Sequence, residues 1–209
     1  MFSAIIACAI SYILGSIPNG LILGKMIWNT DLRQHGSGNI GATNAWRTIG
    51  KPAGILIFLL DFLKGAIAAL MPALITFIGL NASEEYIYVL VVLCGIAALV
   101  GHSCSIFLGF KGGKSVATGL GVLSMMMPQV TVMVFLIWFL VVISSGYVSL
   151  GSIIAAGLVP ILAWLIGYHP AYQVFGLFAA VFVIYRHKSN IERLRNGTES
   201  KIKPPSRHR

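Results

Sequence analysis

Long apolar segments, interrupted by short polar ones, restrict what this chain can fold into more than any other feature. An apolar helix of about 20 residues can cross the hydrocarbon core of a bilayer. Only 10% of the 209 residues are charged, against about 25% in a typical soluble domain. Because the apolar segments are continuous, without alternating polar residues, they favour helices over the strands of a membrane barrel. The sequence therefore predicts an all-α integral membrane protein.

Seven segments are predicted to be membrane-spanning helices. The first contains Pro18 and Asn19 near its end, which predict a kink or an early exit, and the second begins at Pro52, a residue that suits a helix start. The second also contains Asp61 and Lys64, which we expect to pair because an isolated charge within a membrane is costly. The predicted spans are residues 2–23, 52–78, 86–100, 115–127, 129–143, 152–166 and 171–185.

The positions of the Lys and Arg residues predict the orientation of this seven-helix bundle. Eight of the fifteen follow Tyr185, so the positive-inside bias places the C-terminus in the cytoplasm. Seven crossings then place the N-terminus outside. The outer links are predicted at 79–85, 127–129 and 167–170, and they contain no Lys or Arg. The cytoplasmic segments are predicted at 25–51, 101–114, 144–151 and 186–209.

The polar segment 36–47 reads Gly-Ser-Gly-Asn-Ile-Gly-Ala-Thr-Asn-Ala-Trp-Arg. Its three glycines allow positive φ and a close approach of the backbone to a ligand, and successive N–H groups in such a turn bind anions. Ser37, Asn39 and Asn44 add hydrogen-bond donors, and Arg47 offers the fork that suits phosphate. The alternative interpretation is a glycine-rich turn that only caps the next helix.

A second glycine-rich segment, 101–115, carries His102, Lys111 and Lys114. It is not a P-loop, because Leu108 stands where the first glycine of that motif is needed. The two lysines flank a Gly-Gly pair just before a predicted helix, and helix N-termini attract anions. We favour an anion site over ordinary positive-inside flanking. His102 fits two roles equally well, either contacting substrate or hydrogen-bonding a helix end.

Two further polar segments lie on the same predicted side of the membrane. Residues 144–152 form a polar inner loop that contains Ser149, and residues 186–201 contain His187 and Asn190. Basic residues alone would suit a lipid-headgroup surface, but that interpretation does not account for His187, Asn190 or the Asn-Gly-Thr-Glu sequence at 196–199. We expect a single domain over residues 1–200 and a basic, flexible tail over 201–209.

Residues 36–47, 101–118 and 190–201 resemble the three signature regions of the bacterial acyl-phosphate:glycerol-3-phosphate acyltransferases. The strings Ser-Gly-Asn-Ile-Gly-Ala-Thr-Asn and Phe-Lys-Gly-Gly-Lys carry the resemblance, which covers nearly the whole chain in order and spacing. The chain departs from the family at 103–105, where Ser-Cys-Ser replaces an aromatic-Pro pair, and at Ser115, where glycine is common. The resemblance implies a seven-helix bundle in the bacterial inner membrane, with its active site facing the cytoplasm.

The resemblance also implies the reaction. An acyl group would pass from acyl phosphate to the sn-1 hydroxyl of glycerol 3-phosphate, giving lysophosphatidic acid and inorganic phosphate without a cofactor. Holding two anionic headgroups together requires a pocket rich in cations and N–H groups. We expect one phosphate on Ser37, Gly38 and Asn39, clamped by Arg47.

The second phosphate is expected on Lys111 and Lys114, with Ser149 as an additional donor. The resemblance places His187 and Asn190 in the same centre. His187 is a candidate general base for the hydroxyl, since its reference pKa lies near neutral. Alternatively, a substrate phosphate takes the proton and His187 only positions the hydroxyl.

Other classes of protein fit the sequence less well. No His, Cys or carboxylate cluster has metal-ligand spacing, and Cys8, Cys94 and Cys104 are scattered in apolar segments, as expected of reduced thiols. Nothing indicates nucleic acid, and membrane lipid is the expected surroundings. A transporter of an anionic solute is the main rival, but no internal repeat is visible. Docking of an acyl carrier protein on the inner loops stays open.

Overall fold

The computed structural model describes residues 2–77 and 83–202, and within these residues every regular element is a helix. The prediction of an all-α fold is confirmed. Predicted residue 78, most of the outer link 79–85 and tail residues 203–209 lie outside the described part. The α-helices are α1 Phe2–Ser16, α2 Asn19–Trp28, α3 Ala42–Thr48, α4 Lys51–Phe77, α5 Glu84–Ser103, α6 Val116–Met126, α7 Pro128–Ser145, α8 Val148–Ile166, α9 Pro170–Arg186 and α10 Lys188–Arg195, and the 3₁₀ turns are Leu32–Gln34 and Ile106–Leu108.

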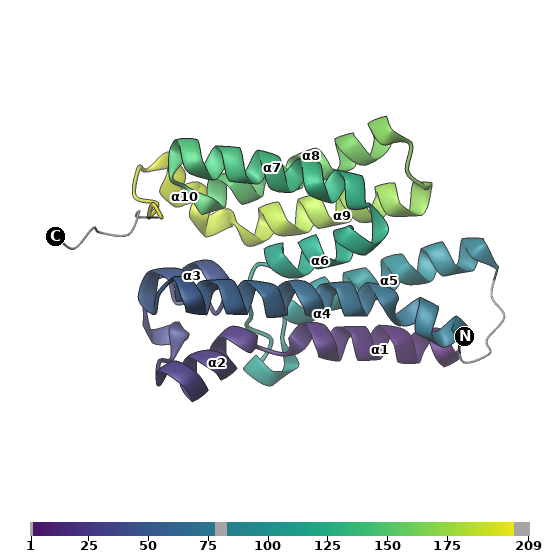
Figure 1. Cartoon of the computed structure of the whole chain (residues 1–209), viewed down its shortest axis with the longest axis horizontal. Coiled ribbons are helices and arrows are strands. Elements are labelled where there is room, and N and C mark those ends of the chain that lie inside the picture. The colour runs from purple at the N-terminus through teal and green to yellow at the C-terminus, as the bar shows by residue number, and fades with distance from the viewer. Residues whose placement is uncertain (1, 78–82, 203–209) are drawn as a thin grey trace.

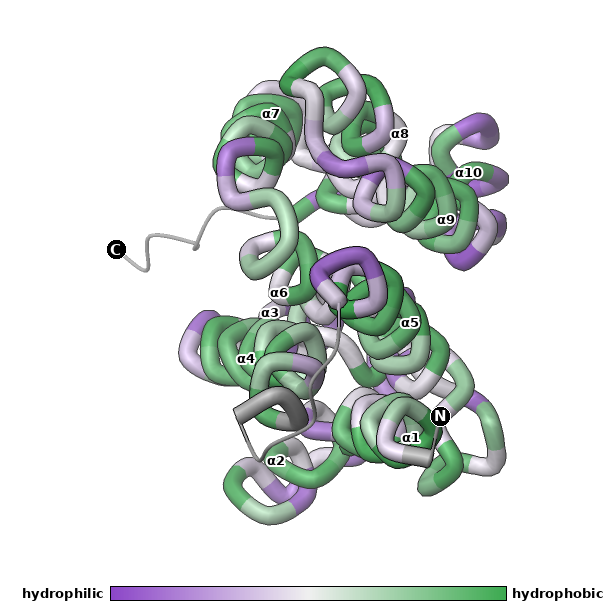
Figure 2. The backbone as a smooth tube through the Cα atoms, turned by 90° about the vertical axis from the view of Figure 1, so that its right-hand side faces the viewer, coloured by the Kyte–Doolittle hydropathy of each residue, from purple (hydrophilic) through white to green (hydrophobic). Residues whose placement is uncertain are grey.

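The long helices run roughly along one direction in two groups (Figure 1). Helices α1, α4 and α5 form one group and α7, α8 and α9 the other, with the short α6 between them (Figures 1 and 2). Most residues of these helices are coloured hydrophobic (Figure 2). Many of their large apolar side chains are exposed. Exposed apolar side chains on most helices are what a lipid-facing bundle presents.

Within residues 2–77 and 83–202, five helical segments are long and apolar enough to cross a membrane, including the combined α1–α2 segment. Two predicted spans correspond to shorter apolar helices, α6 with 11 residues and α9 with 17. At about 1.5 Å per residue α6 is roughly 16 Å long, about half the thickness of the hydrocarbon core. The count of seven crossings and the orientation of the termini therefore stay predictions.

The predicted interruption at Pro18 separates α1 from α2 and creates a polar junction. Proline has no N–H to donate to the helix, and at this break the carbonyl of Ile17 accepts a hydrogen bond of 2.8 Å from Lys64 Nζ. Lys64 also pairs with Asp61 at 2.8 Å, which confirms the predicted pair. Asn19 donates to the same carboxylate at 3.0 Å. The junction thus fixes the broken first helix against α4.

Glycines bring α4 and α6 into backbone contact. A Cβ on Gly65 would clash with the carbonyl of Thr118, and one on Gly121 with the carbonyl of Phe62. Such close approach is what small residues permit between membrane helices. This contact fixes the N-terminal end of α6, which lies beside the polar segments of the candidate site described below.

The expected polar loop at 144–151 is mostly helical, which corrects the sequence-based boundary. Ser144 and Ser145 donate to carbonyls three or four residues earlier in α7, so their hydroxyls need no loop. Gly146, with φ of 80°, ends α7, and α8 starts at Val148. Ser149 therefore stands in the first turn of α8, where the helix fixes its direction.

Candidate active site

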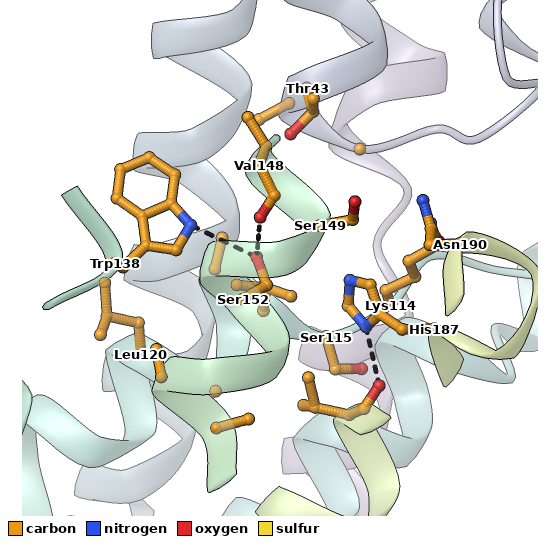
Figure 3. A pocket seen from close by; sticks show the side chains of 18 of the residues that line it. Thr43, Lys114, Ser115, Leu120, Trp138, Val148, Ser149, Ser152, His187 and Asn190 are labelled. Carbon is orange, nitrogen blue, oxygen red and sulfur yellow. Dashed lines mark hydrogen bonds between the residues drawn. The ribbon is translucent and has the colours of Figure 1, made fainter. Parts of the chain in front are cut away.

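Polar residues from distant parts of the chain line a single cavity of about 530 Å³ (Figure 3). One part of its wall is polar, and the rest is apolar and formed largely by α6, α7, α8 and α9. Most of the predicted site residues lie in this wall, whereas Gly38 and Lys111 do not. The polar and charged side chains that line it include Ser37, Asn39, Thr43, Asn44, Arg47, Asp61, His102, Lys114, Ser115, Ser149, Ser152, His187, Asn190, Arg193, Glu199 and Ser200.

Asn44 organises the glycine-rich loop before α3. Its amide nitrogen donates to the carbonyls of Leu32, His35 and Asn39 at 2.8–3.0 Å, and its Oδ1 accepts from the N–H of Ser37 at 2.9 Å. Only 2% of Asn44 is exposed. The side chain of Asn44, which was predicted to donate to substrate, therefore makes its hydrogen bonds to the loop backbone. Ser37, whose backbone N–H is held by Asn44, and Asn39 are the loop side chains that line the cavity and remain as candidate donors.

Arg47, on α3, brings a partly desolvated cation to the cavity. Its Nη2 donates to the carbonyl of Ser200 at 2.6 Å, while its Nε is buried and has no hydrogen-bond partner among the described residues. Burial lowers the pKa of this guanidinium, although arginine stays protonated in proteins. A buried cation with a free donor is suited to bind an anion.

Lys114 lies at the start of α6, between the Gly-Gly turn and Ser115. Its Nζ contacts Asn190 Oδ1 closely, and Lys114, Ser115, Val116 and Ala117 all line the cavity. The free N–H groups of a helix start attract anions, and here a lysine stands beside them. Burial and the nearby Arg193 lower the pKa of Lys114 to about 8.

Lys111 and Gly38 were predicted at the site, but they lie outside the cavity wall. The turn explains the difference between the two lysines. Gly112 N–H donates to the carbonyl of Ser103, and Gly113 N–H to that of His102, both at 3.0 Å. Lys111 precedes these anchored glycines and stays exposed, so only Lys114 reaches the cavity.

His187, at the junction of α9 and α10, is buried and faces the cavity (Figure 3). Its Nδ1 lies 2.7 Å from the carbonyl of Val183, so in the neutral ring this nitrogen carries the proton and donates. Burial lowers the pKa of His187 to about 4. At neutral pH the side chain therefore leaves Nε2 free to accept a hydrogen bond.

Glu199 is one of the polar residues of the cavity wall that the sequence interpretation missed, together with Ser152, Arg193 and Ser200. Its carboxylate accepts hydrogen bonds of 2.7 Å from Ser149, Asn190 and Arg193, and only 7% of the residue is exposed. Burial by itself would raise the pKa of Glu199, but these three bonds lower it. Its sequence signal was the Asn-Gly-Thr-Glu stretch, which interrupts a basic tail.

His102 and Asp61 lie at the edge of the cavity nearest the polar junction. His102 Nδ1 is 3.8 Å from Asp61 Oδ1 and has no hydrogen-bond partner among the described residues. Both roles predicted for His102 stay open. Within the described part of the chain, no group of three His, Cys, Asp or Glu side chains is arranged to hold a metal.

Comparison with known proteins agrees with this geometry. The sequence profile of the family described as glycerol-3-phosphate acyltransferase matches residues 5–197. The chain belongs to the glycerol-3-phosphate acyltransferase family. This assignment confirms the resemblance found in the sequence and the expectation of an acyltransferase.

Members of the glycerol-3-phosphate acyltransferase family match this chain over most of its length. The relative from Syntrophomonas wolfei is 44% identical over 91% of this chain and 93% of its own. The relative from Carboxydothermus hydrogenoformans is 43% identical over 95% and 96%. The crystal structure of PlsY (YgiH), an integral membrane glycerol 3-phosphate acyltransferase in its glycerol 3-phosphate form, covers 96% of both chains with 37% identity and a TM-score of 0.87.

A second crystal structure of PlsY, in its lysophosphatidic acid form, is 36% identical and has a TM-score of 0.84. The protein described by the present sequence thus has the fold of an integral membrane acyltransferase. Its membrane helices and a role in lipid biosynthesis follow from membership of the family.

Proposed function

We propose that this protein transfers a fatty acyl group from acyl phosphate to the sn-1 hydroxyl of glycerol 3-phosphate. The products are lysophosphatidic acid and inorganic phosphate. The observation that carries this proposal is that one cavity joins a cationic, N–H-rich wall to a long apolar wall. An amphiphilic donor with an anionic head and a fatty tail needs both walls at once.

The cationic wall suits two phosphates held close together. Arg47 and Lys114 reach the cavity from different elements, and the start of α6 adds free N–H groups. Such donors are fixed before substrate binds, so they offset the repulsion between two anionic heads without reorganisation. We assign one phosphate to Ser37, Asn39 and Arg47 and the other to Lys114 and the N–H groups at the start of α6. The single hydroxyl proton of Ser149, which was expected at this phosphate, is donated to Glu199 instead.

The chemical step breaks the acyl–phosphate bond. The sn-1 oxygen attacks the carbonyl carbon of the mixed anhydride. The bond between that carbon and the bridging oxygen breaks, and its electron pair leaves on the phosphate. Phosphate takes the hydroxyl proton, because a histidine whose pKa lies near 4 is a weak base at neutral pH. His187 Nε2 and Asn190 then position the hydroxyl.

The apolar wall accommodates the fatty tail. Along α8 it extends from Val148 to Val159, which is about 16 Å at 1.5 Å per residue. Small side chains form part of it, Ala155 and Ala156 on α8 and Ala179 and Ala180 on α9. A tail in this position is shielded from water, while the polar head stays at the mouth with the soluble acceptor.

We further propose seven membrane crossings in the bacterial inner membrane, with the N-terminus outside and the site on the cytoplasmic side. Soluble glycerol 3-phosphate then enters from the cytoplasm. The polar segments that line the cavity gather at one end of the bundle, as this topology requires (Figure 1).

The test uses the purified full-length protein with acyl phosphate and glycerol 3-phosphate, and measures lysophosphatidic acid and released phosphate. Parallel reactions supply the same acyl group on coenzyme A or on acyl carrier protein. We expect equal amounts of both products with acyl phosphate only. Product from another donor alone would overturn the donor assignment. Labelled phosphate that crosses vesicles without any lysophosphatidic acid would favour a transporter.

A further inference from the structure

Arg186, the last residue of α9, binds the backbone of the Gly-Gly turn. Its Nη2 donates to the carbonyls of Gly113 at 3.0 Å, Ser103 at 3.3 Å and Gly112 at 3.4 Å. Its Nε donates to the same Gly113 carbonyl at 3.3 Å. Arg186 does not line the cavity, so its contacts with the turn are separate from any contact with substrate.

The turn that Arg186 holds leads directly into Lys114. Ser103 Oγ donates to the carbonyl of Gly113 at 3.0 Å and lies 2.8 Å from Ser115 Oγ, which supports the turn from α5. On its other side, Lys114 contacts Asn190 of α10. Residues on α5 and α9 therefore fix the backbone immediately before the lysine whose amine reaches the cavity.

We propose that Arg186 is a positioning residue for the acyl transfer, which fixes the Gly112–Gly113 turn so that Lys114 points at the bound phosphate. That the ligand of Lys114 is a phosphate rests on the proposed function. The contacts of Arg186 with the turn do not depend on it. The planar guanidinium reaches three carbonyls at once, whereas a lysine ammonium is a point charge on a flexible chain. Geometry, and not charge alone, is therefore the property required at position 186.

The pKa of the Lys114 amine depends on where the side chain lies. Arg47 on α3, Arg186 on α9, Arg193 on α10 and the carboxylate of Glu199 all influence its charge, and neutral Asn190 contacts it. Burial is the largest cause that lowers its pKa. If the turn is released, the amine gains solvent and moves away from cations, and both changes raise its pKa.

The experiment measures the pH dependence of trace acetylation at each lysine of the purified protein by peptide mass spectrometry, without substrate. In the wild type we expect Lys114 to react with a midpoint near 8. In Arg186→Gln and also in Arg186→Lys, we expect that midpoint to rise by about one pH unit. Exposed Lys111 is the internal reference, and Lys188→Ala, which removes an exposed charge two residues further on, is the matched control.

Lysophosphatidic acid formation by the same samples completes the test. We expect kcat/KM to fall roughly tenfold or more in both Arg186 variants, with unchanged elution from gel filtration. An unchanged Lys114 midpoint in either folded variant would overturn the inference, as would full activity of Arg186→Lys. If the wild type forms no lysophosphatidic acid, the proposed function fails, while the acetylation profiles still test the contact of Arg186 with the turn.

Discussion

Arg47 lines the cavity and has a donor, Nε, with no hydrogen-bond partner among the residues that the structure describes. Replacing it with alanine removes a fixed positive charge from the proposed phosphate site. We therefore expect Arg47→Ala to lower kcat/KM by roughly 100- to 1,000-fold, measured as lysophosphatidic acid formation. Lys188→Ala is the control, because Lys188 is exposed and lies over the ring of Tyr185. Equal losses in both variants would indicate general surface electrostatics instead of a defined site.

The pKa of Lys114 predicts how kcat/KM changes at alkaline pH. Burial lowers its pKa to about 8, so the amine is charged below that pH and loses its proton as the pH rises through it. The pH dependence of kcat/KM reports the pKa values of groups in the free enzyme, so we expect kcat/KM to fall above about pH 8. Lys114→Gln should be weakly active without this alkaline decrease. A decrease that persists in Lys114→Gln would assign the titration to another group.

The pKa of His187 predicts how the rate changes on the acidic side of the pH profile. Because burial lowers its pKa to about 4, the ring stays neutral as the pH falls from about 7.5 to 5.5. If neutral His187 only positions the hydroxyl, His187→Gln should lower kcat roughly 10- to 100-fold by the same factor at every pH in this range. An acidic decrease present in the wild type and lost in the variant would make His187 the base.

At this scale the sequence predicted which residue types bind anions, but not which way each side chain points. Arg47, Lys114, His187 and Asn190 were predicted at the site and line the cavity. Asn44 lines it too, yet its amide faces the loop carbonyls, a direction that depends on the fold of the loop. Glu199 escaped prediction because a carboxylate in a basic tail usually forms a surface ion pair.

Among the elements, the pair α4–α6 depends on glycine. Gly121→Ala would place a Cβ against the carbonyl of Phe62, and helix backbones cannot move apart as easily as a side chain can rotate. We expect a loss of about 1–3 kcal/mol of stability, seen as a lower Tm in detergent. Activity should fall as well, because Lys114 lies in the turn that leads into α6.

The control for Gly121 is Gly157→Ala on α8, where an added Cβ meets no atom within 4 Å. This variant should be neutral or more stable by up to about 1 kcal/mol, since glycine lowers helix stability. Equal destabilisation by both substitutions would show that lost glycine flexibility, and not helix–helix contact, decides the effect.

Helix positions were predicted most accurately where apolar segments are long. The predicted span 86–100 became α5 from Glu84 to Ser103, and 171–185 became α9 from Pro170 to Arg186. The short α3 was not predicted, because its seven residues follow a glycine-rich turn and carry no apolar periodicity. Serines at 144–152 suggested a loop, although the hydroxyls of Ser144, Ser145 and Ser152 bond within α7 and α8.

For the whole molecule, charge alone predicted that the polar segments share one side of the membrane. The structure brings residues near 37, 114, 149 and 187 to one cavity, an arrangement consistent with that interpretation. The apolar wall could not be predicted, since it depends on which faces of α6, α7, α8 and α9 meet. Side chains such as Ala155 and Ala180 gain their role only from that packing.

The proposed topology predicts opposite labelling at the two ends of the molecule. A background without cysteine, with Cys8, Cys94 and Cys104 replaced, would carry either Glu84→Cys or Arg195→Cys. Both sites are exposed. Glu84 begins α5 and Arg195 ends α10, and these two helix ends lie at opposite ends of the bundle (Figure 1). An odd number of crossings, whether five or seven, places the termini on opposite sides of the membrane.

The positive-inside bias assigns Arg195 to the cytoplasm. A membrane-impermeant maleimide should therefore label Glu84→Cys in intact cells, and Arg195→Cys only in inverted vesicles. Labelling of Arg195→Cys in intact cells would place the mouth of the cavity outside. The soluble acceptor could not then enter from the cytoplasm.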